Sequence, residues 1–270
     1  MHGAGNDFVL VDDRESAFPA ADRDLIARLC RRRTGIGADG VVLLQRSALA
    51  DARVRFFNAD GGEAEMCGNA LRCAARFAGD RGVAGAVLRV ETVAGILGAE
   101  VLPGGDRVRL RMTAPTDWRA DMDLPLAGVR VRCGSVNTGV PHAVIEAGDL
   151  PAAAADGGAD AFLALAPRVR RHPAFGAAGT NVNLVTATGP ANLSVRTFER
   201  GVEGETLACG TGVTACALVM ARRGRVRPPV DVTVAGGDVL TVDFTLTDGG
   251  AEAVTLCGPA VTVFDGHVDV

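Results

Sequence analysis

Short apolar stretches, several of them alternating with polar residues, recur along most of the chain. Stretches of this length and pattern are typical of strands, and alternation is typical of antiparallel sheets. The pattern therefore predicts strands at residues 9–11, 41–44, 54–57, 87–90, 107–112, 129–133, 143–145, 182–185, 191–198, 230–234, 239–245, 253–256 and 261–263.

Two longer runs have helical character, and each follows a Cys-Gly pair. Residues 70–78 follow Cys67-Gly68, residues 213–223 follow Cys209-Gly210, and glycines end both runs. Gly79 and Gly224 are expected to adopt the left-handed conformation that closes a helix. With so few helices among so many strands, the sequence predicts an α+β fold in which a mostly antiparallel β-sheet wraps around one central helix in each half.

The segments that lead into the two Cys-Gly pairs are also related. Phe57 lies ten residues before Cys67, Phe198 lies eleven before Cys209, and the surrounding residues are Arg-Phe-Phe-Asn and Arg-Thr-Phe-Glu. This spacing indicates an internal duplication of a strand, loop and helix, with one cysteine in each copy.

The duplication and the length of 270 residues predict two pseudo-symmetric halves. The N-terminal half is expected to span residues 1–114, joined by 258–270, and the C-terminal half residues 115–257. Residues 115–125 are expected to link the halves, and residues 152–166 to form a surface loop with some helix around 161–172.

Composition excludes several classes of function. The net charge of −4 argues against a nucleic-acid partner, and the sequence has no apolar run of 18 residues that would span a membrane. Seven cysteines without CxxC spacing favour a reducing compartment, so we expect a cytoplasmic protein. The four histidines are scattered singly, so no metal is expected. The sequence contains no lysine, which excludes a Schiff base to pyridoxal phosphate.

Residues 35–40 match the pattern GxGxxG. The dinucleotide-binding fingerprint needs a strand before the pattern and a helix after it, whereas here a predicted helix precedes and a predicted strand follows. We therefore expect a tight turn or a close approach of the backbone, and no nucleotide.

The positions of Cys67 and Cys209 suggest acid–base chemistry. The unpaired N–H groups at a helix N-terminus favour an anion, so a thiol there is expected to lose its proton near neutral pH. A thiolate on one side of a carbon acid and a thiol on the other would invert the centre without a cofactor. The N–H groups of Gly68, Asn69, Gly210 and Thr211 would then stabilise the α-carboxylate as charge builds on it.

Seven motifs together resemble the diaminopimelate epimerase family, from residue 2 to about residue 264. They are residues 2–8 (HGAGNDF), 35–40 (GIGADG), 57–61 (FNADG), 66–69 (MCGN), 179–183 (GTNVN), 199–201 (ERG) and 208–212 (ACGTG). Many members have glutamine at the position of Gly40 and asparagine at the position of Val140.

The resemblance implies an isomerase that converts LL-2,6-diaminopimelate to the meso isomer without a cofactor, in lysine and peptidoglycan precursor biosynthesis. It implies an active site in the cleft between the halves and, since the family often forms homodimers, a homodimer. Cys67 and Cys209 become the catalytic pair, with Cys67 the base for the LL isomer and Cys209 for the reverse reaction. The residues implied to bind the substrate are Asn6, Asn58, Gly68, Asn69, Asn181, Glu199, Arg200, Gly210 and Thr211, and His142 matches a motif near the cleft.

Two other functions remain open at this point. A proline or hydroxyproline racemase also uses two cysteines, but typically has histidine after the first Cys-Gly, where this chain has Asn69. A non-enzymatic protein would instead use the thiols for redox sensing or binding. Taken singly, Cys30, Cys73, Cys133, Cys216 and Cys257 are expected to be buried apolar residues without chemistry.

Overall fold

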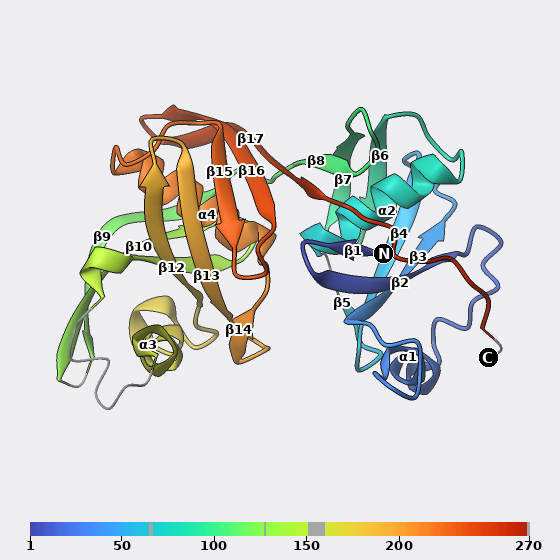
Figure 1. Cartoon of the computed structure of the whole chain (residues 1–270), viewed down its shortest axis with the longest axis horizontal. Coiled ribbons are helices and arrows are strands. Elements are labelled where there is room, and N and C mark those ends of the chain that lie inside the picture. The colour runs from blue at the N-terminus through green and yellow to red at the C-terminus, as the bar shows by residue number, and fades with distance from the viewer. Residues whose placement is uncertain (65–66, 127, 151–159, 269–270) are drawn as a thin grey trace. The chain divides into compact units, whose positions relative to one another are not determined.

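The computed structural model describes residues 1–64, 67–126, 128–150 and 160–268. The chain divides into two units, one formed by Met1–Arg111 with Cys257–Val270 and the other by Met112–Leu256 (Figure 1). The sequence-based boundaries lie at 114 and 257. The unit that contains both chain ends is called unit 1 and the other unit 2.

Unit 1 consists of a mixed sheet around a central helix, α2 (Gly68–Asp80), and a second helix, α1 (Arg23–Cys30). Its strands are β1 (His2–Gly3), β2 (Asn6–Asp12), β3 (Gly40–Gln45), β4 (Ala52–Asn58), β5 (Glu63–Ala64), β6 (Val87–Thr92), β7 (Gly95–Val101) and β8 (Arg107–Arg111). The pairs β2–β3 and β4–β6 are parallel, and β3–β4, β4–β5, β6–β7 and β7–β8 are antiparallel.

Unit 2 repeats this order of elements. Its helices are α3 (Ala161–Arg170) and α4 (Gly210–Arg222), with short 3₁₀ turns at Ala147–Asp149 and Pro173–Phe175. Its strands are β9 (Thr116–Leu126), β10 (Val129–Asn137), β11 (Pro141–Glu146), β12 (Asn181–Gly189), β13 (Asn192–Glu199), β14 (Gly204–Thr206), β15 (Val230–Val234) and β16 (Val239–Thr247). Strand β17 (Gly250–Pro259) leads back to unit 1.

The strand pairs of the two units correspond residue by residue. Val41 of β3 faces Phe57 of β4, and Val182 of β12 faces Phe198 of β13. β11–β12 and β13–β15 are parallel, as are β2–β3 and β4–β6 in unit 1. The α+β prediction with an internal repeat is confirmed, although each sheet is mixed and includes parallel pairs.

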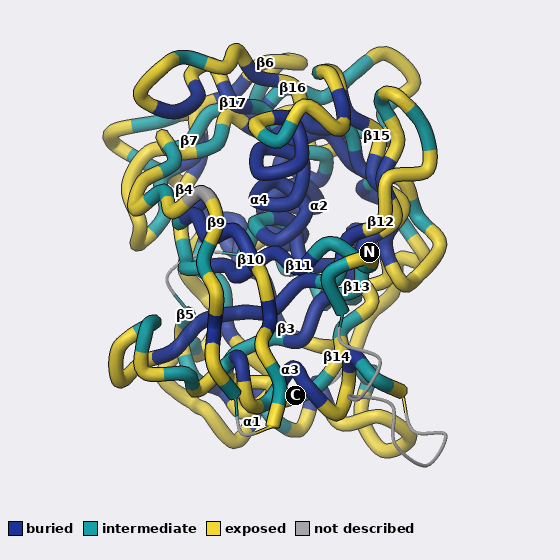
Figure 2. Tube along the Cα trace, turned by 90° about the vertical axis from the view of Figure 1, so that its left-hand side faces the viewer, coloured by how far each residue is buried: buried dark blue, intermediate teal, exposed yellow. Residues whose placement is uncertain are grey.

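The central helices α2 and α4 are buried along most of their length, as Figure 2 shows. Each has 13 residues, begins directly after a cysteine, and is followed two residues later by a glycine with positive φ. The glycine is Gly82 (φ 66°) after α2 and Gly224 (φ 71°) after α4. The prediction for Gly224 is confirmed, but the one for Gly79 is wrong, because the first helix continues through Gly79 to Asp80.

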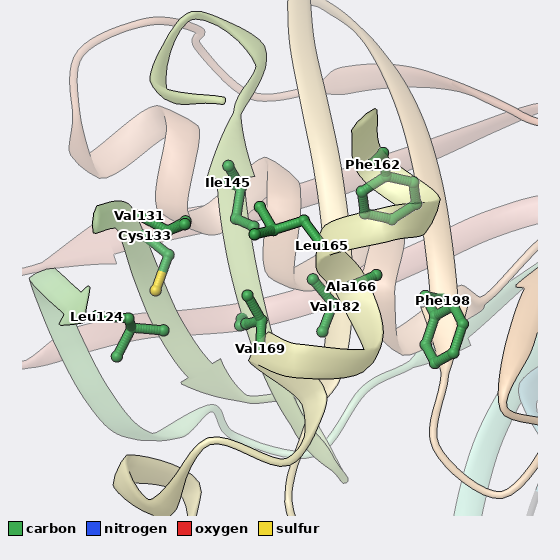
Figure 3. Close-up of a cluster of buried hydrophobic side chains, with 11 residues drawn as sticks. Leu124, Val131, Cys133, Ile145, Phe162, Leu165, Ala166, Val169, Val182 and Phe198 are labelled. Carbon is green, nitrogen blue, oxygen red and sulfur yellow. The ribbon is translucent and has the colours of Figure 1, made fainter. Parts of the chain in front are cut away.

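Two segments of unit 2 differ from the sequence-based prediction. Residues 116–126, expected as a link, form strand β9, which pairs with β10. The helix expected around residues 161–172 is confirmed as α3, but residues 161–166 do not belong to a surface loop, because the α3 side chains Phe162, Leu165 and Val169 join a buried cluster with Ile145 and Val182 (Figure 3). The remainder of the expected loop, residues 152–159, lies outside the described residues.

Strand prediction was otherwise accurate in position but short in extent. β1, β5, β7, β9 and β14 were missed, and residues 261–263 contribute only a single bridge, between Val261 and His2. In the parts of the chain that the structure describes, no helix is both long and apolar enough to cross a membrane.

Candidate active site

The first cysteine, Cys67, is the N-cap residue of α2 and is half-buried. Its extended backbone lets its carbonyl accept the first helical hydrogen bond, from Leu71, at 2.8 Å. Its Sγ lies 3.7 Å from Asn6 Oδ1. The predicted place of this cysteine at a helix N-terminus is confirmed. Asn6, Asp39, Cys67 and Asn69 are called the Cys67 site below.

The amide of Asn6 is held in one orientation. Its Nδ2 donates to Asp39 Oδ2 at 2.7 Å, while its Oδ1 accepts from Asn69 Nδ2 at 3.2 Å and faces Cys67. Asp39 in turn accepts from Arg32 at 3.0 Å. Because a carboxylate can only accept, Asn6 must turn its oxygen toward Cys67.

The loop of residues 35–40 positions Asp39, a residue that the sequence analysis did not select. It follows α1 and leads into β3, so the predicted order of a helix before the loop and a strand after it is confirmed. A Cβ on Gly35 would lie 2.0 Å from Arg28 O, and one on Gly40 would lie 2.4 Å from Phe57 O. Both contacts are shorter than any real Cβ contact, so only glycine fits at these two positions. The sequence could have pointed to Asp39, because it is an acidic residue inside a glycine-rich loop.

The remaining predicted residues of unit 1 are placed as follows. Asn58 ends β4 and is exposed, and its backbone closes a turn with Gly61 and Gly62. Among the described residues, no hydrogen bond joins its side chain to the Cys67 site. A Cβ on Gly68 would meet nothing within 4 Å, so the first turn of α2 is open at that point.

The second cysteine, Cys209, is the N-cap residue of α4 and is 8% exposed. Its Sγ lies 3.4 Å from Thr211 Oγ1, and Thr211 Oγ1 lies 2.9 Å from His142 Nε2. Gly210, at the first position of the helix, is buried. Cys209, Thr211, His142, Asn183 and Glu199 are called the Cys209 site.

The hydrogen bonds of Asn183 determine which nitrogen of His142 carries the proton. Asn183 Nδ2 lies 3.0 Å from Ala143 O, which can only accept, so this atom is the amide nitrogen. The same nitrogen donates to His142 Nδ1 at 3.1 Å, and Asn183 Oδ1 accepts from Thr197 at 2.9 Å.

A neutral His142 therefore carries its proton on Nε2 and donates it to Thr211 Oγ1. The Thr211 hydroxyl can then donate to Cys209 Sγ. Neither Asn183 nor Thr197 was selected from the sequence, since buried polar residues inside strands give no signal there. A Cβ on Gly212 would lie 2.5 Å from Asn183 Oδ1, so glycine makes room for this network.

His142 is neutral because of its surroundings. It is fully buried, and burial together with the positive charge of Arg200 lowers its pKa from 6.5 to about 3. It therefore serves as a hydrogen-bond donor at neutral pH and carries no charge.

The protonation of Cys209 differs from the sequence-based expectation. Burial and the nearby negative charge of Glu199 raise the pKa of the Cys209 thiol well above its ordinary value. The Thr211 hydroxyl and the Gly212 N–H act in the opposite direction and are outweighed. Burial beside a carboxylate thus opposes the loss of the proton that a helix N-terminus favours, a balance that the sequence-based expectation left out.

Glu199 ends β13 and is held by Thr206, whose hydroxyl donates to Glu199 Oε1. Burial raises the pKa of the Glu199 carboxyl, and hydrogen bonding partly offsets this. Asn181 Oδ1 accepts from the backbone N–H of Arg200 at 2.7 Å, so Asn181 fixes the start of the turn after β13. The side chain of Arg200 is half-buried, with Nη1 3.4 Å from Gly179 O.

None of the seven cysteines is paired in a disulfide. Among the described residues, no group of three or more His, Cys, Asp or Glu side chains is placed to hold a metal ion. The structure thus brings Asn6, Cys67 and Asn69 together at the start of α2, and His142, Cys209 and Thr211 together at the start of α4, while Asn58 lies outside these groups.

Known proteins resemble the chain over nearly its whole length. The model of the family described as diaminopimelate epimerase matches residues 1–118 and 134–263. The diaminopimelate epimerase of Aquifex aeolicus is 40% identical over 99% of this chain and 96% of its own length. That of Desulforudis audaxviator is 43% identical, covering 98% of this chain and 96% of its own.

A solved structure described as a probable proline racemase from Agrobacterium radiobacter shares the fold, with a TM-score of 0.66. It covers 96% of this chain and 88% of its own, but at 20% identity it supports the architecture alone. The family match and the two full-length relatives agree with the motifs at both cysteines, and the chain belongs to the diaminopimelate epimerase family.

Proposed function

We propose that this chain converts LL-2,6-diaminopimelate to meso-diaminopimelate by a two-base reaction in which Cys67 and Cys209 act on opposite faces of one carbon. The observation that carries the proposal is the full-length relation to diaminopimelate epimerases together with one N-capping cysteine in each unit. No cofactor takes part in the proposed reaction.

The proposed reaction moves two protons. The Cys67 thiolate removes the α-proton of the LL isomer and becomes a thiol, and the electron pair left on carbon is delocalised into the α-carboxylate. The Cys209 thiol gives its proton to the opposite face and becomes a thiolate. The raised pKa of Cys209 supports its role as proton donor in this direction. In the reverse reaction the two residues exchange roles.

The proposed substrate contacts follow from the donors at each site. The N–H groups of Gly68, Asn69, Gly210 and Thr211 belong to the first turns of α2 and α4, where they would stabilise the α-carboxylate and the charge that builds on it. Arg200 is proposed to bind the distal carboxylate in a bidentate manner. Asn6, Asn58, Asn181 and Glu199 are proposed to position the rest of the substrate.

The test is proton NMR of LL-diaminopimelate with reduced protein in D2O. We expect loss of the α-proton signal and appearance of the meso isomer with the wild type, and neither with Cys67→Ala or Cys209→Ala. Cys216→Ala is the matched control, because Cys216 is a buried thiol of the same helix as Cys209 and should leave exchange intact.

L-Proline serves as the competing substrate in the same experiment. Exchange on proline but not on diaminopimelate would replace the proposal with a proline racemase. Absence of exchange on both, with folded protein and reduced thiols, would favour a binding or redox role.

An odd number of cysteines without CxxC spacing supports a reducing compartment, and we propose that the enzyme acts in the cytoplasm, in the supply of lysine and peptidoglycan precursors. We also propose a homodimer, on the basis of the family relation. Light scattering coupled to size-exclusion chromatography tests this, and a mass near 27.7 kDa would contradict it.

A further inference from the structure

The guanidinium of Arg200 is half-buried, and among the described residues it forms no ion pair with a carboxylate. Its Nη1 lies 3.4 Å from Gly179 O. Burial and, in addition, the charge of Arg200 lower the pKa of His142, so this charge reaches the Cys209 site. A half-buried cation whose polar contact is a carbonyl oxygen is suited to bind an anionic group of a ligand.

Two hydrogen bonds fix the backbone around Arg200. Its own N–H donates to Asn181 Oδ1 at 2.7 Å, and the next N–H, of Gly201, donates to Glu203 Oε1 at 3.3 Å. Glu203 has a positive φ of 56° and donates its N–H to Glu199 O at 2.8 Å, which closes the turn between β13 and β14. The direction in which Arg200 leaves this turn therefore depends on the carboxylate of Glu203.

Arg170, the last residue of α3, holds that carboxylate. Its Nε donates at 2.7 Å to Glu203 Oε1, the same oxygen that accepts from Gly201. The side chain of Arg170 is 15% exposed, whereas that of Arg171, which donates to Glu203 Oε2, is 63% exposed. Because solvent and salt weaken an exposed ion pair most, Arg170 is the stronger of the two anchors.

Arg170 also fixes the residue whose carbonyl contacts the Arg200 side chain. Its Nη1 donates to Ala178 O at 3.1 Å and its own carbonyl accepts from the N–H of Thr180 at 3.1 Å, so Gly179 is held from both sides. A Cβ on Gly179 would lie 2.2 Å from Arg170 O, and the φ of Gly179 is 69°. Only glycine therefore fits beside Arg170 at this position.

We propose that Arg170 is a positioning residue that sets the place of Arg200, because it ties both the turn at Gly201 and the segment at Gly179 to the end of α3. In the proposed reaction Arg200 binds the distal carboxylate, so Arg170 determines how tightly a substrate with two carboxylates is bound. That consequence rests on the proposed function, whereas the positioning of Arg200 does not.

A second ion pair between α3 and the same two strands provides a matched control. Glu205, in β14, accepts from Nε and Nη2 of Arg196, both at 2.7 Å, and Arg196 also pairs with Asp160 at the start of α3. In the described part of unit 2, these three side chains form no hydrogen bond with Arg200. Loss of Glu205 therefore removes a comparable ion pair at a place that does not position Arg200.

The first test is hydrogen exchange of single backbone N–H groups, followed by NMR without substrate. In Arg170→Gln and in Glu203→Ala we expect the N–H of Arg200 to exchange about tenfold faster than in the wild type, because the turn opens more often. Glu205→Ala should leave this N–H as protected as in the wild type. Unchanged exchange at Arg200 in both variants of the proposed anchor overturns the proposal.

The second test is the steady-state rate of epimerisation of LL-diaminopimelate. In Arg170→Gln and Glu203→Ala we expect KM to rise about tenfold and kcat to change less than about twofold, because a displaced Arg200 weakens binding of a carboxylate remote from the reacting carbon. Glu205→Ala and Arg171→Gln should keep the wild-type KM. A loss confined to kcat, or an equal rise of KM in either control, overturns the role of Arg170 in substrate binding.

Glu203→Ala decides the matter if Arg170→Gln does not fold, since Glu203 lies on an exposed turn. The two tests also separate this proposal from the proposed function. A wild-type protein without isotope exchange on diaminopimelate contradicts the proposed function, and hydrogen exchange at Arg200 still decides whether Arg170 positions it.

Discussion

Cys67 and Cys209 occupy the same place in their helices and differ in the side chains around them. Cys67 is half-buried, with a buried arginine and two asparagines nearby, whereas Cys209 is buried beside a carboxylate and a neutral histidine. The surroundings of Cys209, and not its position at a helix N-terminus alone, therefore govern its protonation. Two predictions concern single residues of the Cys209 site.

The Thr211 hydroxyl accepts a hydrogen bond from His142 and can donate one to Cys209. Thr211→Val removes the hydroxyl but keeps the shape of the side chain. A hydrogen bond to a charged group contributes about 1.5 to 3 kcal/mol, so we expect kcat/KM to fall roughly ten- to a hundredfold. Isotope exchange rates in D2O measure the effect, and Thr211→Ser should retain most of the activity. Equal rates in Thr211→Val and the wild type would show that the hydroxyl has no part in catalysis.

His142 should make the protein sensitive to acid. Its pKa is about 3 when folded and 6.5 in the unfolded chain, so between these values the unfolded chain binds a proton that the folded protein does not. The free energy of unfolding should accordingly fall as the pH decreases from about 6.5 toward about 3. Urea denaturation over this range should show a shallower decline in His142→Gln.

The exposed His267 provides the control for that experiment. His267→Gln should keep the full decline of the wild type. An equally steep decline in His142→Gln would mean that carboxylates alone produce the acid sensitivity.

At the scale of elements, α2 and α4 are nearly equivalent in backbone. Both end in a hydrogen bond around a glycine with positive φ: Gly82 N–H donates to Gly79 O at 3.0 Å, and Gly224 N–H to Ala221 O at 2.9 Å. These bonds satisfy carbonyl groups that the last turn of a helix leaves unpaired.

The two closing glycines should respond alike to substitution. Gly82→Ala and Gly224→Ala should each destabilise the protein by about 1 kcal/mol, because an L side chain disfavours the left-handed conformation. Gly79→Ala, inside α2 and with open space around it, should stabilise by about 0.5 to 1 kcal/mol. Urea denaturation of the three variants measures this, and a destabilised Gly79→Ala would contradict a helix that continues through Gly79 to Asp80.

At the scale of the whole molecule, two distinct bases lead to a prediction about isotopes. If separate groups remove and deliver the proton, the meso product formed in D2O should carry deuterium at the inverted centre from the first turnover. The LL substrate that remains should keep its α-proton early in the reaction. NMR and mass spectrometry of both pools check this, and early deuterium in the recovered LL isomer would indicate a single base.

The sequence predicted the features that depend on local pattern. The strand positions, the two N-capping cysteines and the duplication all follow from short-range spacing, and the structure confirms them. The end of α2 was misplaced because Gly79 is tolerated inside a helix held by tertiary packing.

What the sequence did not predict depends on distant neighbours. Arg72 is buried although its residue type favours the surface, and one of its two hydrogen-bond partners, Pro259 O, comes from far along the chain. The same holds for Asn183, which acts on His142 across paired strands. The high pKa of Cys209 depends on depth of burial, which a helix-capping pattern does not reveal.

The matched backbones of α2 and α4 also make the two halves a natural subject for grafting. Residues 67–82 and 209–224 have the same length from capping cysteine to closing glycine, so a segment from one half meets the same two ends when transplanted into the other. Side chains such as Arg72 and Thr214 would then travel with the graft while their distant neighbours stayed behind. Chimaeras of this kind separate what a helix carries in its own sequence from what its surroundings confer.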